Sequence, residues 1–411
     1  MTEAMAGELV TIARLGAKGD GIVETADGPV YVSFALPGER WRLGGEEDVA
    51  ELVTPAPDRQ QPLCRHFGKC GGCLAQHMPA ELYRVWKEDI LRQALAHRGI
   101  DAKIEPMRIV AAHSRRRAFF GVARRGGGVV LGFREEGQHK LVDLSECPVL
   151  DPAIVAAMPA LREMAGQVLA EDSGGRLIVT RVEDGLDVAI EGGRKDLGPD
   201  VLARLARLAA SARWQRLTVD GTIVFMQQAP VLTLGGARVE IPQGAFLQAV
   251  PEAETIMIDL VTAAVGKAKN LADLFSGLGT FAFPLARKSR VLAVDSERRS
   301  IEALEKAARG ATGLKPIATK VRDLMREPLS RTELAQFDAV VIDPPRAGAK
   351  DQVEALARAK VPRVVMVSCN PATFARDART LIDGGYKISK VTPIDQFLFS
   401  PHLEVVAAFS R

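Results

Sequence analysis

The chain of 411 residues carries a formal net charge of +3 and is 47% hydrophobic and 26% charged. This composition is typical of globular proteins, and the length exceeds one ordinary hydrophobic core. The amino terminus lacks a signal-peptide pattern, no apolar run reaches membrane-spanning length, and five cysteines are an odd number for a disulfide framework. We expect a cytoplasmic, multidomain monomer without membrane attachment, whose charge permits nucleic-acid binding without requiring it.

The first segment, residues 1–58, is predicted to form a small antiparallel β-barrel. Strand-type runs at residues 8–13, 21–25 and 29–33 are separated by glycines, as in small barrels. After a proline-rich linker, residues 80–98 show apolar side chains at helical spacing and predict an amphipathic helix. This helix could pack on the carboxyl-terminal domain despite its early position in the chain.

Two larger domains are predicted to follow. Residues 59–240 form a central α/β domain, in which strands dominate and helices lie near 152–170 and 199–210. From about residue 270, short apolar strands alternate with helices, which is typical of a doubly wound sheet. We therefore expect a multidomain α/β fold that ends in a Rossmann-like domain at residues 241–411.

A glycine loop follows the first strand of that last domain. Gly277, Gly279 and Ala282 match a nucleotide-binding fingerprint, and Asp295 ends the next strand, where it can bind ribose hydroxyls. Both a nicotinamide dinucleotide and S-adenosylmethionine are compatible with this pattern. Another strand ends in the Asp-Pro-Pro-Arg turn at 343–346, and such a rigid turn suits a carboxylate that faces a flat nucleobase. The turn favours S-adenosylmethionine, although an aspartate before prolines is often only a turn.

Cys369 stands directly after the apolar run Val364–Ser368, at the predicted carboxyl end of a buried strand. Asn370 is a good helix N-cap and Pro371 suits the first helical position. The positive end of a helix should lower the pKa of the thiol and favour a nucleophilic thiolate. The alternative is a buried, inert cysteine.

Four further cysteines are spaced as a ligand set. Cys64, Cys70 and Cys73 lie close together and Cys147 follows far downstream. Four thiolates can bind zinc or an iron–sulfur cluster, and this spacing is nearer to a ferredoxin-like set than to a zinc ribbon with two close pairs. His66 and His77 are interpreted as a supporting or surface pair.

The motifs together resemble the RNA uracil carbon-5 methyltransferases, a class I methyltransferase family. The resemblance spans nearly the whole chain and rests on the glycine loop 273–281, the turn 343–348, the Ser-Cys-Asn-Pro run at 368–371, Gln248, and the Pro-His-Leu-Glu segment that ends at Glu404. It implies methyl transfer from S-adenosylmethionine to carbon-5 of a uridine in RNA. It also implies an amino-terminal TRAM-like, OB-like domain and a [4Fe–4S] cluster at the four cysteines.

The resemblance also assigns roles to single residues. In such enzymes a thiolate adds to carbon-6 of uracil, which activates carbon-5, and a base later removes the carbon-5 proton. Two positions depart from the family pattern: Val250 stands where an asparagine is frequent, and Thr280 stands where a larger polar residue is frequent. The implied roles are nucleophile for Cys369, base for Glu404, support of either the base or the methyl donor for Asp343, metal binding for Cys64, Cys70, Cys73 and Cys147, and methyl-donor binding for Gln248, Phe275, Gly277, Thr280, Asp295, Asp323 and Asp343.

The substrate RNA is expected to meet a segment in which basic and aromatic side chains alternate, as phosphate contact and base stacking require. This segment contains Arg115, Arg116, Arg117, Phe119, Phe120, Arg124, Arg125 and Arg134. The alternative is an outer strand face with one phenylalanine in the core. The barrel and the four cysteines resemble the 23S rRNA branch of the family. A tRNA enzyme and a non-catalytic RNA-binding protein are the rival interpretations.

Overall fold

The computed structural model describes residues 7–44, 50–194 and 196–411. Residues 1–6, 45–49 and 195, which belong to the predicted segments 1–58 and 59–240, lie outside the described residues. Among the described residues, no helix is long and apolar enough to cross a membrane.

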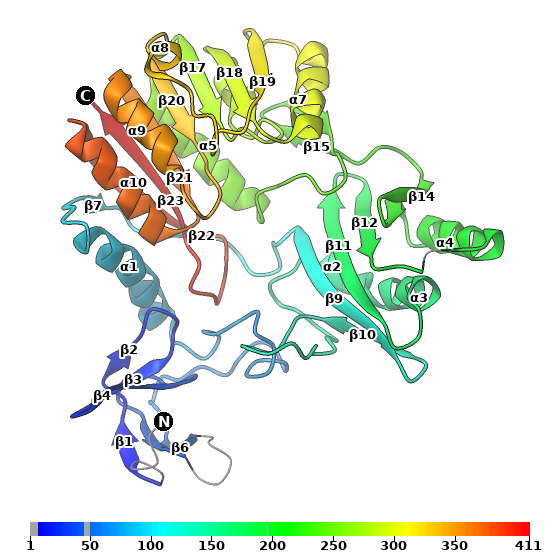
Figure 1. Ribbon diagram of the computed structural model, residues 1–411. Coiled ribbons are helices and arrows are strands. Elements are labelled where there is room, and N and C mark those ends of the chain that lie inside the picture. Colours follow the sequence, from blue (N-terminus) through cyan, green and yellow to red (C-terminus); the bar gives the residue numbers. More distant parts are fainter. Residues whose placement is uncertain (1–6, 45–49, 195) are drawn as a thin grey trace.

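The amino-terminal unit consists of two small antiparallel sheets of three strands each (Figure 1). Val10, Val23 and Trp41 come from both sheets and share one core. The expected closed barrel is not seen in the described part of the chain, because strands of two to five residues pack side chains across the core without pairing from one sheet to the other. The strands are β1 (Leu9–Thr11), β5 (Arg40–Arg42) and β6 (Glu51–Thr54) in one sheet, and β2 (Arg14–Leu15), β3 (Gly21–Thr25) and β4 (Gly28–Val32) in the other.

The central unit is a six-stranded sheet in the order β10-β9-β11-β12-β13-β14. All neighbouring strands are antiparallel except β12 and β13. The apolar faces of three helices pack on this sheet, where Phe120, Leu161 and Trp214 are buried in one core. The elements are β9 (Arg117–Arg125), β10 (Gly128–Gly132), α2 (Pro152–Ala156), α3 (Met158–Val168), β11 (Gly174–Val182), β12 (Gly185–Glu191), α4 (Pro199–Ser211), β13 (Trp214–Val219) and β14 (Thr222–Met226).

The carboxyl-terminal unit is a doubly wound sheet in the order β19-β18-β17-β20-β21-β23-β22-β7, with β8 also paired to β22. The strand order reverses between β17 and β20, and ligands of such sheets bind at the carboxyl ends of the strands beside the reversal. The strands are β17 (Asn270–Leu274), β18 (Arg290–Asp295), β19 (Ile317–Val321), β20 (Ala339–Ile342), β21 (Arg363–Ser368), β22 (Lys387–Asp395) and β23 (Glu404–Ser410), joined by β7 (Lys103–Ile104) and β8 (Arg108–Ile109).

Helices cover both faces of this sheet (Figure 1). Its two cores are rich in valine, leucine and alanine, as expected for parallel strands buried on both sides. The hairpin of β15 (Val231–Leu234) and β16 (Ala237–Glu240) contributes to one of these cores. The helices are α5 (Pro251–Val265), α6 (Ala282–Ala286), α7 (Arg298–Gly310), α8 (Arg331–Leu334), α9 (Lys350–Ala359) and α10 (Pro371–Asp383).

Helix α1 (Ala80–Ala96) connects the amino-terminal unit with the carboxyl-terminal sheet (Figure 1). It packs against α10, and its Trp86 indole donates a hydrogen bond to the backbone oxygen of Gly16 at 2.9 Å. The buried Lys87 ammonium pairs at 2.6 Å with Asp395, the last residue of β22. The helix therefore holds the loop between β22 and β23 in place.

Candidate active site

A cavity of about 1220 Å³ lies where the carboxyl ends of the doubly wound strands face the central sheet and residues 64–75, which we call the cysteine-rich loop. It brings together residues that are far apart in the sequence. Its lining includes all the residues to which the family resemblance assigned a catalytic, metal-binding or methyl-donor-binding role: Cys64, Cys70, Cys73, Cys147, Gln248, Phe275, Gly277, Thr280, Asp295, Asp323, Asp343, Cys369 and Glu404.

The glycine loop leaves β17 through a tight turn that requires glycine. Gly279 has φ +94°, and a Cβ there would lie 2.8 Å from the ring of Phe283. Gly277 has φ +52° and open space beside it, and its backbone N–H donates to Asp295 Oδ2 at 2.9 Å. The loop backbone and the Asp295 carboxylate are thus fixed together at one edge of the cavity, as a ribose-binding site requires.

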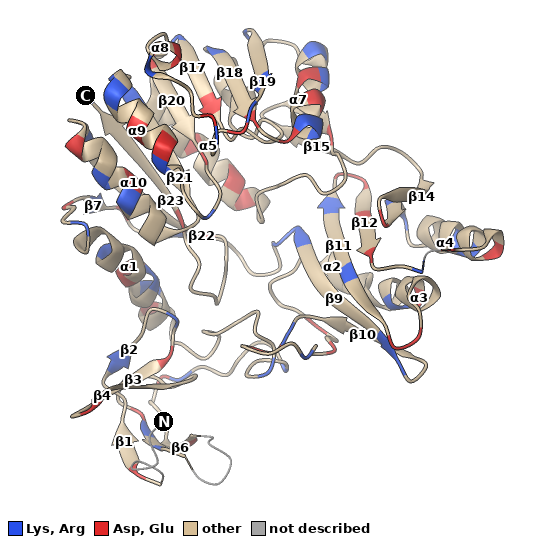
Figure 2. Ribbon diagram, viewed as in Figure 1, with Lys and Arg blue, Asp and Glu red and all other residues tan. Residues whose placement is uncertain are grey.

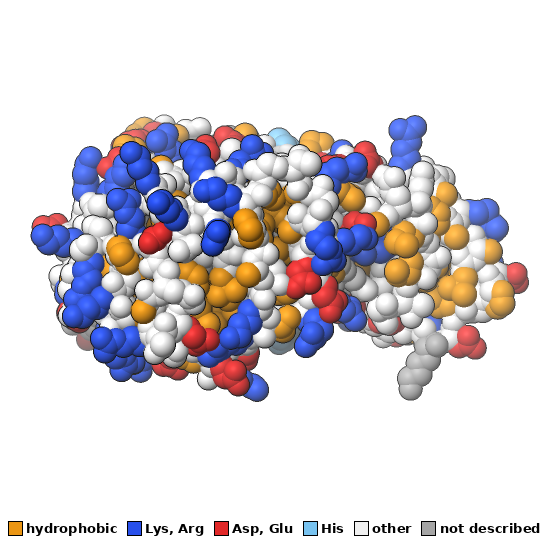
Figure 3. Space-filling model, turned by 90° about the horizontal axis from the view of Figure 1, so that it is seen from above, with side chains coloured by type: hydrophobic (Ala, Val, Ile, Leu, Met, Phe, Trp, Pro, Cys, Tyr) orange, Lys and Arg blue, Asp and Glu red, His pale blue; other side chains and the backbone are white. Residues whose placement is uncertain are grey.

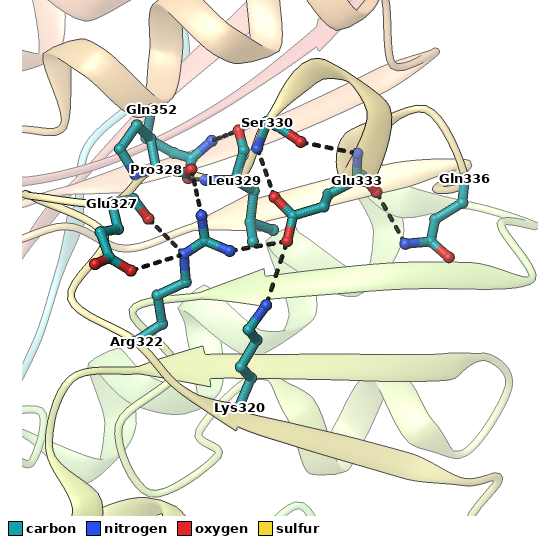
Figure 4. A network of polar contacts seen from close by, with 9 residues as sticks. All are labelled: Lys320, Arg322, Glu327, Pro328, Leu329, Ser330, Glu333, Gln336 and Gln352. Atoms are coloured by element: carbon teal, nitrogen blue, oxygen red, sulfur yellow. Dashed lines mark hydrogen bonds and ion pairs between the residues drawn. The ribbon is translucent and has the colours of Figure 1, made fainter.

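The loop after β19 carries Asp323 and is held by its neighbour Arg322. The Arg322 guanidinium donates to the backbone oxygens of Glu327 and Pro328 at 2.6 and 2.8 Å. It also forms an ion pair with Glu333 at 2.8 Å, at the start of α8 (Figure 4). Several hydrogen bonds from one side chain restrict the loop, so Asp323 has a defined place in the cavity wall.

A chain of buried polar side chains forms the floor of the site. Gln248 Nε2 donates to Asp343 Oδ2 at 3.1 Å, and Gln396 Nε2 donates to Gln248 Oε1 at 3.0 Å and to Glu404 Oε1 at 2.9 Å. The sequence interpretation missed Gln396. The sequence signal that could have identified it is its position, directly after a buried strand and eight residues before Glu404.

The electrostatic environment of Cys369 differs from the sequence prediction. Burial, and then the nearby charges of Glu404 and Asp343, raise the pKa of the Cys369 thiol to about 11. Asn370 caps α10 as predicted, since its Oδ1 accepts from Ala372 N at 3.1 Å, and Arg346 acts to lower the thiol pKa. The expected low pKa was therefore wrong for the free protein, because desolvation and two carboxylates outweigh the helix end.

Both carboxylates are themselves shifted. Burial and the charge of Asp343 raise the pKa of Glu404 to about 8. Burial raises the pKa of Asp343 to about 7, against the hydrogen bond from Gln248 that lowers it. A buried acid with a pKa near the working pH is suited to general acid–base catalysis.

The four clustered cysteines are free thiols on one wall of the cavity. Burial raises the pKa of Cys73 to about 12, and the charges of the other three thiols act in the same direction. Within the described ranges, no group of three or more ligand-type side chains is placed to hold a metal ion, so the cluster stays a prediction.

The two neighbouring histidines have different environments. His66 Nε2 accepts a hydrogen bond from Ser145 N at 3.0 Å. His77 is fully buried against the rings of Phe34 and Phe67, so it is not a surface residue. Of the two interpretations of this pair, supporting or surface, the surface interpretation is wrong for His77, which packs between the amino-terminal unit and the cysteine-rich loop.

The predicted basic strip divides into three environments. Arg116 is buried and pairs with Glu254 at 2.6 Å, and the Arg115 guanidinium lies 5.9 Å from the Phe397 ring centroid. Arg117 lies 4.6 Å from the ring centroid of Phe119, which is 45% exposed. Basic positions occur on β9 and β11 (Figure 2), and elsewhere Lys and Arg are interspersed with acidic and apolar side chains (Figure 3). Only part of the strip is thus accessible to a ligand.

The doubly wound sheet, with its glycine loop and the cavity at the strand reversal, has the class I methyltransferase fold. The chain aligns over 99% of its length with the structure of the Pyrococcus abyssi tRNA (uracil-54, C5)-methyltransferase in complex with S-adenosyl-L-homocysteine. The TM-score is 0.75, with 24% identity and 100% of that chain covered. At this identity the likeness shows the fold alone.

Sequence comparisons identify the family. Residues 207–411 match the model of the tRNA (uracil-5-)-methyltransferases. A protein of Caulobacter vibrioides described as an uncharacterized RNA methyltransferase is 46% identical over 98% of this chain and 99% of its own. The 23S rRNA (uracil(1939)-C(5))-methyltransferase RlmD of Edwardsiella ictaluri is 32% identical over 98% of this chain and 95% of its own. The chain belongs to the RNA uracil-5 methyltransferase family, as its motifs predicted.

Proposed function

We propose that the protein transfers a methyl group from S-adenosylmethionine to carbon-5 of a specific uridine in 23S rRNA. The observation that carries this proposal is the common cavity, onto which Cys369, Glu404 and the glycine loop all open. A nucleophile, a base and a nucleotide-type site in one cavity match a reaction in which a pyrimidine is activated and methylated in place.

In the proposed reaction the Cys369 thiolate adds to carbon-6 of the uracil, and the electron pair moves to give an enolate. Carbon-5 then attacks the sulfonium methyl group, which leaves S-adenosylhomocysteine. Glu404 takes the proton from carbon-5, and the Cys369–carbon-6 bond breaks to restore the thiolate and the aromatic base. The raised pKa of Glu404 makes it a stronger base than an exposed glutamate.

Methyl-donor binding is proposed for the residues at the strand reversal. Asp295 and the backbone of Gly277 would hold the ribose, since they are already fixed to each other at 2.9 Å. Asp323 and Phe275 would border the nucleoside, and Gln248 and Asp343 would lie beside the transferred methyl group. Thr280 lines the same cavity, and its hydroxyl would reach only methyl-donor atoms that lie close to the loop.

The 23S rRNA assignment is supported by the relative from Edwardsiella ictaluri, which aligns along almost the whole chain. The alternative substrate is a tRNA, which the family description of residues 207–411 favours. In either RNA a uridine within a folded region must be flipped out of its stack before it can reach Cys369.

We also propose that Cys64, Cys70, Cys73 and Cys147 hold a [4Fe–4S] cluster, with zinc as the alternative. The support is the number and chemistry of the thiols: all four are free, they line the same cavity, and four thiolates are the ligand set that such a cluster takes. Binding would have to draw them together, because no three ligand-type side chains among the described residues are placed to hold a metal ion. A cluster there would hold the cysteine-rich loop against the β22–β23 loop. The two loops already contact each other, since Leu74 N donates to Phe399 O at 2.6 Å.

The direct test compares 5-methyluridine in RNA from a wild-type strain and from a deletion strain. We expect one uridine of 23S rRNA to lose its methyl group in the deletion strain, and purified protein with S-adenosylmethionine to restore it in vitro. Restoration in tRNA transcripts alone would favour the tRNA alternative. Unchanged 5-methyluridine in both RNAs, with no activity in vitro, would contradict the proposed function.

A further inference from the structure

Gln396 is the best-connected polar side chain of the site, and no role follows for it from the family motifs named above. It is the first residue after β22 and is 1% exposed. Its carboxamide oxygen accepts the backbone N–H groups of Ala249 at 3.1 Å and Val250 at 3.3 Å. Its nitrogen donates to Gln248 Oε1 and Glu404 Oε1. All four contacts of the carboxamide are therefore within the protein.

These contacts determine which way the amide of Gln396 points. Backbone N–H groups can only donate, so the oxygen of Gln396 must face Ala249 and Val250. The two amide protons then point to Gln248 and Glu404. A flipped amide would place donor against donor at two sites, which costs about 1–3 kcal/mol for each buried group left without a partner. Gln396 thus has one orientation in the folded protein.

The orientation of Gln396 selects one oxygen of Glu404. Glu404 is 3% exposed, and its Oε1 is occupied by the amide proton of Gln396. Its Oε2 is buried and has no hydrogen-bond partner. The oxygen available to take a proton is therefore Oε2, and rotating the carboxylate part of the way out of its present plane would break the bond to Gln396.

The same orientation extends to the next side chain. Because Gln248 Oε1 accepts from Gln396, Gln248 Nε2 must point away and donate to Asp343 Oδ2. Arg116 fixes the backbone at this point, since its Nε donates to Gln248 O at 3.0 Å. One amide thus sets the direction of the polar chain from Glu404 to Asp343.

We propose that Gln396 is a positioning residue that aims Glu404 Oε2 at the substrate and directs the Gln248 amide toward Asp343. The proposal rests on the proposed function and goes beyond it, because it names the group that orients the base. Gln396 is itself held, because the neighbouring Asp395 receives hydrogen bonds from Lys87 at 2.6 Å and Tyr83 at 2.5 Å. Asp343 and Cys369 are the titratable groups whose charges couple to Glu404.

The test uses two variants of the full-length protein. Gln396→Met removes the amide at similar volume. Gln396→Glu keeps an oxygen for the N–H groups of Ala249 and Val250 but brings a carboxylate toward Glu404. Both should slow methylation of an RNA fragment at neutral pH by about 10–100-fold, as expected when a reacting group is misplaced by about 1 Å. The RNA concentration at half-maximal rate should stay within about threefold of wild type, because these changes disturb the position of the base and not the binding of the RNA.

The pH profile is the readout that a merely structural role would not change. Loss of a donor to the carboxylate should move the rising, acid limb of the rate profile to higher pH, further in Gln396→Glu than in Gln396→Met. The matched control is Gln215→Met in the central sheet, which removes another buried amide, one that donates to Asp184 O at 2.6 Å. It should lower thermal stability and leave the acid limb where wild type has it.

The outcomes separate the inference from the proposed function. An acid limb at the wild-type pH in Gln396→Glu, in a protein that is folded by circular dichroism, would overturn the positioning role while wild-type activity stands. If Gln396→Met does not fold, Gln396→Glu decides. A wild-type protein that methylates no RNA would overturn the proposed function itself, before either variant is compared.

Discussion

At the scale of single residues, the site is a buried cluster of acids around a thiol of high pKa. The thiol of Cys369 is not ionised in the free protein at neutral pH, because its pKa is raised to about 11 by burial and by two carboxylates. Its ionisation has to be coupled to substrate binding or to transfer of its proton to a neighbouring carboxylate. Activity should therefore depend on groups that move protons, and the first two predictions address these groups.

Cys369→Ala should reduce methyl transfer to RNA below detection, because no other thiol in the described cavity lies at the end of β21. The fold and the affinity for S-adenosylmethionine should stay within about twofold of wild type, since the thiol is partly exposed and supports no core. Labelled methyl incorporation and calorimetric binding of the methyl donor would measure both. Incorporation near the wild-type rate would exclude Cys369 as the nucleophile.

Glu404→Gln should block the reaction after methyl transfer, because glutamine keeps the hydrogen bond from Gln396 but cannot take the carbon-5 proton. A methylated Cys369–RNA adduct should accumulate and migrate slowly in denaturing electrophoresis. The added change Cys369→Ala should remove this band. Normal turnover, or inactivity without an adduct, would point to another base, and His402 would be tested next.

The same variant tests the buried acid through stability. The pKa of Glu404 is raised from 4.5 to about 8, so the folded protein binds more protons than the unfolded chain between these values. Stability therefore falls as pH rises through this window, and the full cost of the buried carboxylate is present above pH 8. Glu404→Gln should unfold at a higher temperature than wild type at about pH 9, with the difference vanishing below the unfolded pKa, at about pH 4. Equal melting temperatures at both pH values would show that the carboxylate is not buried in solution.

At the scale of elements, the sequence predicted those parts that depend on local pattern. β17, β18, β20 and β21 were found because interior parallel strands form continuous apolar runs, and the capped start of α10 was read from its N-cap and proline. β7 was not found, because a two-residue strand has no periodicity and forms only by pairing with β22 far along the chain. Non-local pairing is the information that a local pattern lacks.

The same reason explains what was missed in the site. The importance of Gln396 depends on backbone groups at Ala249 and Val250, which are distant in sequence. Val250 is itself 1% exposed and part of a core, so no polar side chain is present where the family frequently has asparagine. The amide of Gln396 instead lies against that backbone. A single sequence predicts which residues reach the cavity more readily than how they bind one another.

The start of β9 gives a prediction at this scale. Arg117 is 8% exposed but lines the cavity, so it can meet only RNA that enters the cavity. Arg117→Ala should weaken RNA binding and reduce the slope of log K against log salt by about 0.7–0.9, as expected for one lost phosphate contact. Arg116→Ala is the contrasting variant: it leaves Glu254 buried without its partner, which should cost about 3–5 kcal/mol of stability. Filter binding at several salt concentrations and thermal melting measure the two effects. An unchanged salt slope in Arg117→Ala would show that this arginine only stacks on Phe119.

At the scale of the whole molecule, the active site is assembled from every unit of the chain. Helix α1 connects the amino-terminal unit, through Trp86, to the β22–β23 loop, through Lys87. The cysteine-rich loop reaches the same β22–β23 loop, since Leu74 N and Ala75 N both donate to Phe399 O. The loop that carries Gln396 is thus supported from two sides by segments outside the doubly wound sheet.

This arrangement makes the cysteine-rich loop relevant to catalysis without any redox role. If the four cysteines hold a [4Fe–4S] cluster, protein purified without oxygen should be brown and contain about four irons per chain. Cys70→Ser or Cys73→Ser should lose the colour, and residues 395–403 should exchange amide hydrogen faster because their support through Leu74 and Ala75 is loosened. Cys369→Ser is the matched control, because it replaces the one cysteine outside the set and should keep both colour and protection.

A colourless wild-type protein with one tightly bound zinc would replace the cluster by a zinc site. A wild-type protein with neither metal, and with residues 395–403 equally protected in all variants, would show that neither a metal nor these thiols are needed to hold the loop.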